Sequence, residues 1–308
     1  MSRYLKPWAG RMALFCLVFF LGIQAAPAAD GPPVLEESLD PVLGQELRER
    51  LASLGLMEAV RDNTLAVGVA DITDPRHPRV AAVNPERMMY AASLPKIAIL
   101  LGAFERIRAG DMQLDDDTRE QLVRMIRYSS NRAASAMIDR VGMEYIAGVL
   151  TSPRYRLYDP SDHGGLWVGK SYGRDDVWKR DPLANLSHGA NVLQVMRFYY
   201  LLETGKLVSP AFSRQMKAIL GKPGIEHKFV KGLRREHPEA RIYRKSGSWR
   251  EWHADSAIVE HDGRRYIVAA LARSPQGGRW LTRLVGAVDE VVFRTASPTL
   301  QAALDESM

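Results

Sequence analysis

The sequence predicts an α+β fold, with one antiparallel sheet built from both ends of the chain, flanked by helices, and an all-helical lobe between those ends. Three observations predict it. Short β-type runs occur within residues 64–84, three more occur within residues 240–274, and residues 93–150 and 190–220 are dominated by apolar positions at helical spacing. Strands gathered at both ends of a chain, with helices between them, favour an antiparallel sheet over alternating strand–helix–strand units.

The first residues predict a secretory signal peptide over residues 1–28. Arg3, Lys6 and Arg11 accompany the apolar run "MALFCLVFFLGI", and "AAPAAD" offers a small-residue cleavage site. The apolar run is too short for a comfortable membrane span, although an uncleaved anchor is the alternative. We therefore expect a periplasmic or secreted protein that has no stable membrane insertion after cleavage and whose residues 29–308 form one domain.

Composition excludes several classes of site and partner. The only cysteine, Cys16, lies in the leader, so the rest of the chain can form no disulfide and use no thiol nucleophile. The formal charge of +6 falls to about +3 without the three basic leader residues, and the remaining basic residues are scattered. We therefore expect no nucleic-acid partner. No group of His, Asp and Glu has convincing metal-ligand spacing, so we predict no metal and no cofactor.

The first third of the domain contains signals for two helices and two strands. "DPVLGQELRERLASLGL" opens on Asp40 with Pro41 at the first helical position, which predicts a capped helix. "TLAVGVADIT" and "RVAAVN" predict strands joined by the turn "DPRHP". "SLPKIAILLGAFERIRAG" predicts an apolar helix that starts at Ser93 and ends at Gly110, with Pro95 in its first turn, where a missing N–H costs nothing.

The rest of the chain divides into a helical and a strand-rich part. Residues 115–150 predict helix throughout, whereas residues 151–188 lack periodicity and predict a long loop, which is either functional or contains missed elements. "ANVLQVMRFYYLLETGKLVSPAFSRQMKAIL" predicts two helices, "ARIYRKSGS", "DSAIVEHDG" and "RRYIVAALARS" predict three strands, and "GRWLTRLVGAVDEVVFRT" predicts a final amphipathic helix. The α/β part is expected at about 40–92 and 238–296, and the helical lobe at about 93–237.

The stretch "AASLPKIAIL" places a serine and a lysine three positions apart in an apolar run. Residues i and i+3 share one helix face, so Ser93 Oγ and Lys96 Nζ can meet. Apolar surroundings lower the pKa of a lysine, which allows its amine to accept the serine proton near neutral pH. The pair predicts a nucleophile and its base at a helix N-terminus, where free N–H groups favour an oxyanion. A capping serine beside a snorkelling lysine is the alternative.

Two further stretches carry polar groups at defined places. "RYSSNRAAS" contains the triplet from Ser129 to Asn131, and "YRKSGSW" ends a predicted strand with the triplet from Lys245 to Gly247. Taken alone, the first predicts a helix cap and the second an exposed lysine before a bulge on an edge strand. In the functional interpretation, the lysine supports a hydroxyl and holds an acidic substrate group, and the glycine lets a substrate backbone lie close to the strand.

In combination the three motifs are far more specific. Ser-x-x-Lys, Ser-x-Asn and Lys-Ser-Gly, in this order, resemble the motif set of class A β-lactamases and penicillin-binding proteins. The resemblance covers most of the chain after the leader and is closest to the class A branch. "ETGKLVSPAFSRQMKAIL" is similar to the helix pair that follows the active-site loop of that family. The resemblance implies a β-lactamase/D,D-peptidase-like fold.

The resemblance also implies roles for individual residues in catalysis. Ser93 matches the acylated nucleophile and Lys96 its base partner. Ser129 matches the residue that relays a proton to the leaving nitrogen, and Lys245 the residue that lowers the pKa of that hydroxyl.

A second set of residues matches the substrate-binding positions of the family. Asn131 is expected to bind the substrate amide, and Ser246 to contact the substrate carboxylate beside Gly247. The backbone N–H groups of Ser93 and Ser248 are expected to form an oxyanion hole, in which each donor is typically worth a few kcal/mol.

The sequence departs from the family pattern in three places. The usual acid in the middle of the Ser-x-Asn motif is Ser130 here, and the stretch between the first two motifs is short, which puts the usual aromatic at the cleft rim in doubt. The Glu-x-x-Leu-Asn motif, whose glutamate activates the deacylating water, is absent. Its nearest match is "DPLAN", which makes Asp181 the expected deacylation base, although Asp is one methylene shorter than Glu and this geometry tolerates little displacement.

Other assignments for this step stay open. Asp181 is alternatively a structural acid paired with Arg180 or Arg174. His188 in "LSHGAN" and His253 in "WREWHADS" are rival bases because an unperturbed histidine titrates near neutrality, and each is alternatively a hydrogen-bonded structural residue.

The expected function is an exported serine acyl-hydrolase that acts through an acyl-enzyme on a small-molecule or peptidoglycan-derived amide such as a β-lactam. The first alternative is a D,D-peptidase or esterase, and the second is a non-catalytic binding protein on the same scaffold. "GGLWVGKSYG" and "SWREWHADS" bring three tryptophans toward the expected cleft, either as an aromatic wall or as packing residues.

Overall fold

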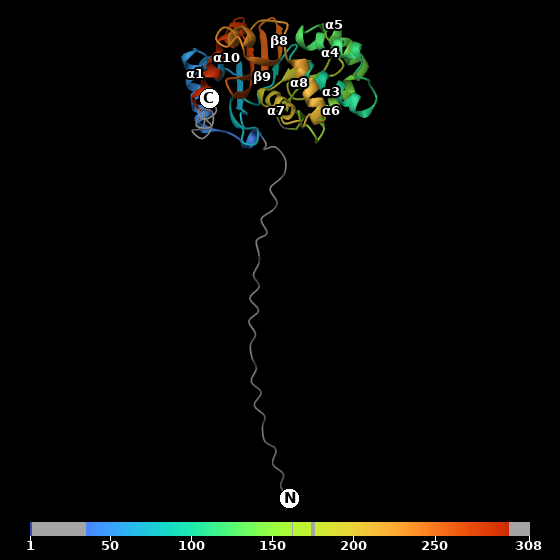
Figure 1. Cartoon of the computed structure of the whole chain (residues 1–308), viewed down its shortest axis with the longest axis horizontal. Coiled ribbons are helices and arrows are strands. Elements are labelled where there is room, and N and C mark those ends of the chain that lie inside the picture. Colours follow the sequence, from blue (N-terminus) through green and yellow to red (C-terminus); the bar gives the residue numbers. More distant parts are fainter. Residues whose placement is uncertain (2–34, 162, 174–175, 296–308) are drawn as a thin grey trace. The chain divides into compact units, whose positions relative to one another are not determined.

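A five-stranded antiparallel sheet in the order β2-β1-β10-β9-β8 forms the centre of the fold. Its strands are β1 (Leu65–Asp71), β2 (Arg79–Val83), β8 (Arg241–Trp249), β9 (Trp252–His261) and β10 (Arg264–Arg273). β1, from the N-terminal part, pairs with β10, from the C-terminal part, with Leu65 opposite Ala272 and Asp71 opposite Tyr266. The predicted sheet from both ends of the chain is therefore confirmed (Figure 1).

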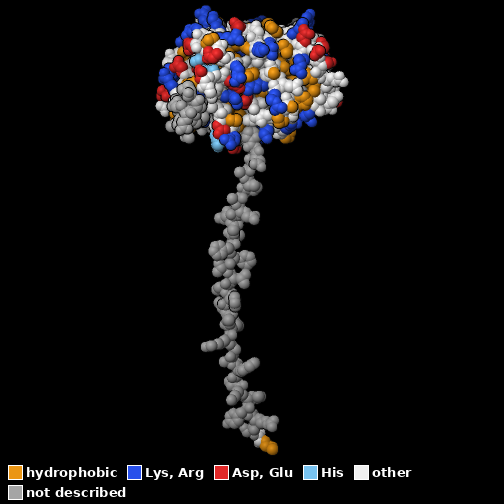
Figure 2. Space-filling model, viewed as in Figure 1, with side chains coloured by type: hydrophobic (Ala, Val, Ile, Leu, Met, Phe, Trp, Pro, Cys, Tyr) orange, Lys and Arg blue, Asp and Glu red, His pale blue; other side chains and the backbone are white. Residues whose placement is uncertain are grey.

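The computed structural model describes residues 35–161, 163–173 and 176–295, which belong to one compact unit. The expected signal peptide of residues 1–28 lies outside the described residues. Within the described part of the chain, no helix combines the length and the apolar character that a membrane crossing requires. On the face that Figure 2 shows, basic and acidic side chains are interspersed.

Helices cover both faces of the sheet, and the alternation of strand residues explains how. Val67 and Val69 of β1 join one core cluster, whereas Ala66 and Ala70 join the other. The first cluster is packed under α1 (Pro41–Ser53), α9 (Phe229–Arg234) and α10 (Gly277–Arg294). The second is packed under α7 (Val192–Glu203) and α8 (Pro210–Leu220) and continues into the helical lobe. Figure 1 shows α1 and α10 on the side of the sheet away from that lobe.

A local signal starts α1 as expected. The carboxylate of Asp40 caps α1 by accepting a hydrogen bond from the Leu43 amide at 2.9 Å. Arg79 of β2 donates to the other Asp40 oxygen at 2.6 Å, so the cap also ties α1 to the edge of the sheet. The short helices η1 (Leu35–Glu37) and α2 (Met57–Arg61) were not expected from the sequence.

Four helices build the lobe between the two halves of the sheet: α3 (Lys96–Ala109), α4 (Asp116–Arg127), α5 (Asn131–Val141) and α6 (Met143–Thr151). The stretch predicted as helix throughout is thus interrupted at residues 128–130 and at Gly142, whose φ of 91° suits a glycine. The central helix α3 has its first ten residues buried, as its apolar sequence predicts. This burial fixes the position of everything at its N-terminus.

The region expected as a long loop contains short strands that the sequence did not reveal. They are β4 (Tyr158–Asp159), β5 (Gly164–Gly165), β6 (Trp167–Val168) and β7 (His188–Ala190), joined by β3 (Met89–Tyr90) from earlier in the chain. β7 pairs with both β3 and β6 to form a small second sheet. The Ala91 amide extends this pairing by donating to the His188 carbonyl at 2.9 Å. The small sheet thereby places β6 and β7 beside the start of α3.

Candidate active site

Ser93 lies in a tight turn between β3 and α3. The helix begins at Lys96 rather than at Ser93, because the preceding residues make shorter-range bonds, such as Leu94 N to Ala91 O at 3.0 Å and Lys96 N to Ser93 O at 3.3 Å. Ala92 adopts a φ of 50°, a conformation that costs free energy for a non-glycine residue and is concentrated at functional sites. The turn holds Ser93 half-buried at the mouth of a cavity.

Lys96 is completely buried, with 0% of its surface exposed. Its ammonium donates to the Ser129 carbonyl at 2.6 Å and to Asn131 Oδ1 at 2.8 Å, and lies 3.5 Å from Ser129 Oγ. It also lies 4.5 Å from the centre of the Tyr172 ring. Burial lowers the pKa of Lys96 to about 7. The prediction of an amine able to carry or release a proton near neutrality therefore has a physical basis in this structure.

Two lysines converge on one hydroxyl. Ser129, which adopts a φ of 56°, receives a hydrogen bond on Oγ from Lys245 Nζ at 3.0 Å, in addition to the approach of Lys96. Lys245 is buried and also donates to the Ser246 carbonyl at 2.7 Å. Burial, together with the nearby charge of Lys96, holds the pKa of Lys245 well below its ordinary value. The residues of the three sequence motifs are thus brought together in space.

A close backbone contact, which the sequence alone does not reveal, explains why residue 247 is a glycine. A Cβ at this position would lie 2.1 Å from the Ala91 carbonyl oxygen and 2.8 Å from the Ser93 amide nitrogen. The glycine is therefore required by the chain's own backbone, since β8 passes directly against the nucleophile turn. This contact places the edge of β8, where Ser248 follows, beside the Ser93 amide that is expected to bind an oxyanion.

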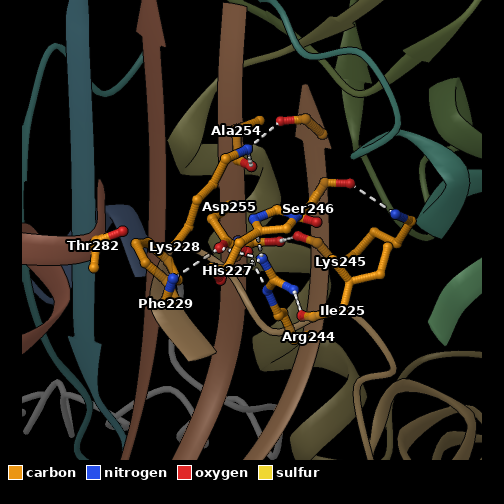
Figure 3. Close-up of polar contacts among 12 residues, drawn as sticks. Ile225, His227, Lys228, Phe229, Arg244, Lys245, Ser246, Ala254, Asp255 and Thr282 are labelled. Carbon is orange, nitrogen blue, oxygen red and sulfur yellow. Dashed lines mark hydrogen bonds and ion pairs between the residues drawn. The ribbon is translucent and has the colours of Figure 1, made fainter. Parts of the chain in front are cut away.

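A buried polar network supports β8 from behind, and sequence analysis missed it. Lys228 donates to the Gly247 carbonyl at 2.5 Å, to Ser248 Oγ at 2.8 Å and to the Ala254 carbonyl at 3.1 Å. Beside it, the Arg244 guanidinium makes two bonds to Asp255, at 2.8 and 2.7 Å (Figure 3). Burial lowers the pKa of Lys228 to about 8. The network holds β8 and β9 in place next to the cavity.

The cavity at Ser93 has a volume of about 340 Å³. Its lining residues are Tyr90, Ala92, Ser93, Asn131, Lys170, Tyr172, Gly173, His188, Ser248 and Trp249. Among these described residues there is no carboxylate, while Lys170 contributes an amine and Lys96 and Lys245 lie close behind Ser129. The electrostatic character of the cavity therefore favours an anionic ligand. Lys170 and Tyr172 lie in the stretch "GKSYG". From the sequence, only the tryptophan just before this stretch was expected near the cleft.

Asp181 is buried, and its carboxylate is occupied by its own loop. Oδ1 accepts from the Tyr158 hydroxyl at 3.0 Å and from the amides of Leu183 and Ala184 at 3.2 and 2.9 Å. Oδ2 accepts from the Leu186 amide at 2.6 Å. These contacts favour the structural alternative for Asp181, but with amide and hydroxyl donors in place of an arginine.

Of the two arginines considered as ion-pair partners of Asp181, one bonds elsewhere and the other lies outside the described residues. Arg180 donates instead to the Asn185 carbonyl at 3.1 Å, and Arg174 lies outside the described residues. Asp181 does not line the cavity at Ser93. Its assignment as the deacylation base stays a prediction, and the geometry weighs against it.

Of the two histidines considered as rival bases, one faces the cavity. His188 stacks on Tyr172 with ring centres 4.2 Å apart, and its Nδ1 is buried with no hydrogen-bond partner among the described residues. Burial, followed by the charges of Lys170 and Lys96, lowers the pKa of His188 to about 3, so the imidazole is neutral at physiological pH. His253 packs instead against Gly277 at the start of α10 and does not line the cavity.

The three tryptophans divide between the two interpretations. Trp249 lines the cavity and is 56% exposed, as an aromatic wall requires. Trp167 is buried, with its ring 4.7 Å from that of Tyr158, and Trp252 packs edge-on against Tyr90 at 6.1 Å.

Ser130, which replaces the usual acid of its motif, has a structural task. Its hydroxyl caps α5 by accepting from the Ala133 amide at 3.2 Å. This cap fixes the turn that carries Ser129 and Asn131, so the departure affects support of the loop, as expected.

Comparisons with known proteins extend this description. The model of the beta-lactamase enzyme family matches residues 46–120 and 117–292. A beta-lactamase structure from Sphaerobacter thermophilus DSM 20745 is similar at 17% identity and a TM-score of 0.64, covering 82% of this chain and 99% of that one. A class A beta-lactamase representative from Bacteroides cellulosilyticus DSM 14838 is similar at 15% identity and a TM-score of 0.62, covering 83% and 99%.

A variant of PBP-A, solved as an acyl-enzyme complex with penicillin G, is similar at 17% identity and a TM-score of 0.63, covering 84% of this chain and 98% of that one. Among curated protein sequences, none matches the chain. At these identities the solved structures establish a shared fold, and the fold expected from the motifs is thereby confirmed.

Proposed function

The chain belongs to the beta-lactamase enzyme family, and on that premise we propose that it is an exported serine acyl-hydrolase that opens an amide through an acyl-enzyme on Ser93. One observation carries the proposal. Two buried lysines meet at the Ser129 hydroxyl, with Nζ of Lys245 at 3.0 Å and Nζ of Lys96 at 3.5 Å, next to a cavity that Ser93 lines.

Acylation follows from the roles of these groups. Neutral Lys96 takes the proton of Ser93 Oγ as that oxygen attacks the amide carbon, forming the C–O bond. The amide N–H groups of Ser93 and Ser248 stabilise the oxyanion. The C–N bond then breaks as Ser129 passes a proton to the leaving nitrogen and recovers one from Lys96. The products are an ester on Ser93 and a free amine, with Lys96 again neutral.

The substrate class is an amide that carries a carboxylate. Lys170 lines the cavity, and no carboxylate does so among its described lining residues, so an anionic group is favoured there. Asn131 and Ser246 are proposed to hold the substrate amide and carboxylate, and Trp249 to supply an apolar wall. A β-lactam or a peptidoglycan-derived peptide has this chemistry.

A second candidate function, a D,D-peptidase or esterase with slow hydrolysis of lactam adducts, is favoured by a specific observation. Deacylation needs a group that activates a water, and the four hydrogen bonds to Asp181 come from its own loop and Tyr158. The PBP-A variant, which has a similar fold and is known as a penicillin G acyl-enzyme, supports keeping this candidate.

The test is covalent labelling followed by intact mass and by a chromogenic reporter. We expect wild type to gain the mass of a penicillin on Ser93 and Ser93→Ala to gain none while keeping its circular dichroism spectrum. Ser53→Ala, which changes an exposed serine on α1, is the matched control and should label like wild type. Labelling of Ser93→Ala at another residue contradicts the assignment. Adduct loss with chromophore release indicates a β-lactamase, and a long-lived adduct indicates the second candidate.

A further inference from the structure

A cluster of histidines and acids lies at the end of the sheet where β9 turns into β10. His237 and Glu239 belong to the connection between α9 and β8, His261 ends β9, and Asp262 is the first residue of the hairpin turn that follows. One ligand atom from each of these four residues lies within 4.8 Å of the others. None of them lines the cavity at Ser93, so the proposed acylation chemistry leaves the cluster without an explanation.

Three of the distances between donor atoms bracket those between tetrahedral metal ligands. His261 Nδ1 lies 3.0 Å from Asp262 Oδ2, and His237 Nδ1 lies 3.9 Å from the same oxygen. His237 Nδ1 also lies 3.6 Å from Glu239 Oε1. Ligand atoms at 2.0–2.2 Å from a tetrahedral zinc ion are about 3.3–3.6 Å from each other. The three spacings of 3.0, 3.6 and 3.9 Å bracket that range, and a shared ion requires the His237 and His261 rings, which are stacked with centres 4.2 Å apart, to tilt toward each other.

A second, independent observation concerns the opposite edges of both rings. Asp289 of α10, which is buried, accepts from His261 Nε2 on Oδ1 at 2.7 Å, and its Oδ2 lies 3.3 Å from His237 Nε2. The Tyr266 hydroxyl donates to Asp289 Oδ1 at 2.7 Å and fixes the carboxylate. A carboxylate on the far ring nitrogen is the usual partner of a metal-binding histidine, because it sets the tautomer and the ring orientation.

This arrangement turns both Nδ1 atoms toward carboxylates. If the proton of each ring is on Nε2, the atom nearer Asp289, each Nδ1 presents a lone pair toward Glu239 or Asp262. Lone pairs facing anions at these distances repel, and a positive charge between them removes the repulsion. That charge is either a second proton on each ring or a metal ion.

We propose that this cluster is a binding site for a divalent transition metal of the zinc class, with His237, Glu239, His261 and Asp262 as ligands. Two imidazoles with two carboxylates match the ligand preference of zinc, whereas calcium and magnesium prefer oxygen ligands. The His261 side chain is fully buried, while Glu239 and Asp262 are 56% and 62% exposed, so an ion has an entry path from solvent.

The metal would act as a structural clamp. It would join the α9–β8 connection to the β9–β10 hairpin, and Asp289 would link both to α10. Asp262 has a φ of 45° in an Asp-Gly turn, and the hairpin favours an aspartate there without any metal. The proposal therefore depends on the histidines and Asp289 rather than on Asp262 alone. Arg264 stands opposite His261 in the strand pairing, and three carboxylates outnumber this one guanidinium.

The experiment is equilibrium dialysis of the chelator-treated chain against zinc, with the bound metal counted by elemental mass spectrometry. We expect one zinc per wild-type chain, and at least tenfold weaker binding in Glu239→Gln and in His237→Gln. Both altered side chains are partly or largely exposed, so both variants should fold. His77→Gln, which alters an exposed histidine paired with Asp74, is the matched control and should bind like wild type.

Thermal unfolding supplies the second readout. Free zinc at 100 times the wild-type Kd should lower the unfolding constant of wild type about 100-fold, which corresponds to about 2.7 kcal/mol, and should lower that of Glu239→Gln about tenfold or less. The proposal is overturned if wild type binds no zinc, or if both cluster variants bind it as tightly as His77→Gln does. Failure of this test leaves the Ser93 labelling result untouched, so the two proposals are tested separately.

Discussion

Two buried ionisable side chains, Lys96 in the lobe and Asp181 in the loop region, are surrounded very differently. Lys96 is 0% exposed and Asp181 is 2% exposed. Lys96 contacts a carbonyl, an amide oxygen and a hydroxyl, and none of these carries a negative charge. Asp181 accepts four hydrogen bonds, three of them from backbone amides of its own loop. Lys96 is thus poised to lose a proton, whereas Asp181 is committed to holding a turn.

Burial alone therefore does not identify a catalytic group. An under-compensated buried charge shifts toward its neutral form, which is the state that a general base needs. A buried carboxylate whose oxygens are already hydrogen-bonded gains little from approaching a water. Three variants test this contrast.

Lys96→Ala should have the largest effect. Removing the base should slow acylation of Ser93 by about 10²–10⁴-fold, the range typical of general-base catalysis. Single-turnover intact mass measures the rate. Lys206→Ala, at an exposed lysine, is the matched control and should acylate at the wild-type rate. Acylation of Lys96→Ala within a few fold of wild type contradicts the role.

Lys245→Ala should have a smaller effect of another kind. It removes a charged hydrogen bond to Ser129 and a cation near the cavity, and such bonds are worth about 1.5–3 kcal/mol. We expect apparent affinity for carboxylate-bearing substrates to fall about 10–100-fold, and much less for neutral esters. The concentration dependence of acylation separates affinity from rate. Equal defects in Lys96→Ala and Lys245→Ala would refute this division of roles.

Asp181→Asn should have the smallest effect on chemistry and a clear effect on stability. An amide in place of the carboxylate points N–H groups at backbone N–H donors, which should cost about 1–3 kcal/mol of unfolding free energy. Denaturant unfolding measures the loss, with Asp62→Asn, at an exposed acid, as control. The lifetime of the acyl-enzyme should match that of wild type. A stable adduct on Asp181→Asn alone would instead identify Asp181 as the deacylation base.

The sequence predicted the large elements because their signals are local. The capped start of α1 at Asp40, the end of α3 at Gly110 and the alternating strands follow from caps, periodicity and turn residues. The strands of two or three residues between residues 158 and 190 carry no such signal. The pairing of β7 with β3 and with β6 depends on contacts between distant segments.

The same distinction explains the site. Ser93, Lys96, Ser129 and Lys245 are found through motifs, since each motif is a contiguous stretch. Lys228 makes three hydrogen bonds that support β8 and β9. It lies in a separate segment that carries no recognisable motif. The histidine–carboxylate cluster was likewise hidden, because its residues come from separate segments, and the sequence prediction of no metal relied on spacing alone.

The pH dependence of the Ser93 acylation rate in single turnover tests directly whether Lys96 is the base. In the proposed mechanism, burial lowers the pKa of Lys96 to about 7, and the neutral amine takes the serine proton. A lowered pKa makes the neutral form dominant above about pH 7, and below it the neutral fraction falls tenfold per pH unit. The account predicts an acylation rate that is level above about pH 7 and falls tenfold per unit below it. A rate that stays constant from about pH 5 to 8, or a fall that persists in Lys96→Ala, would contradict it.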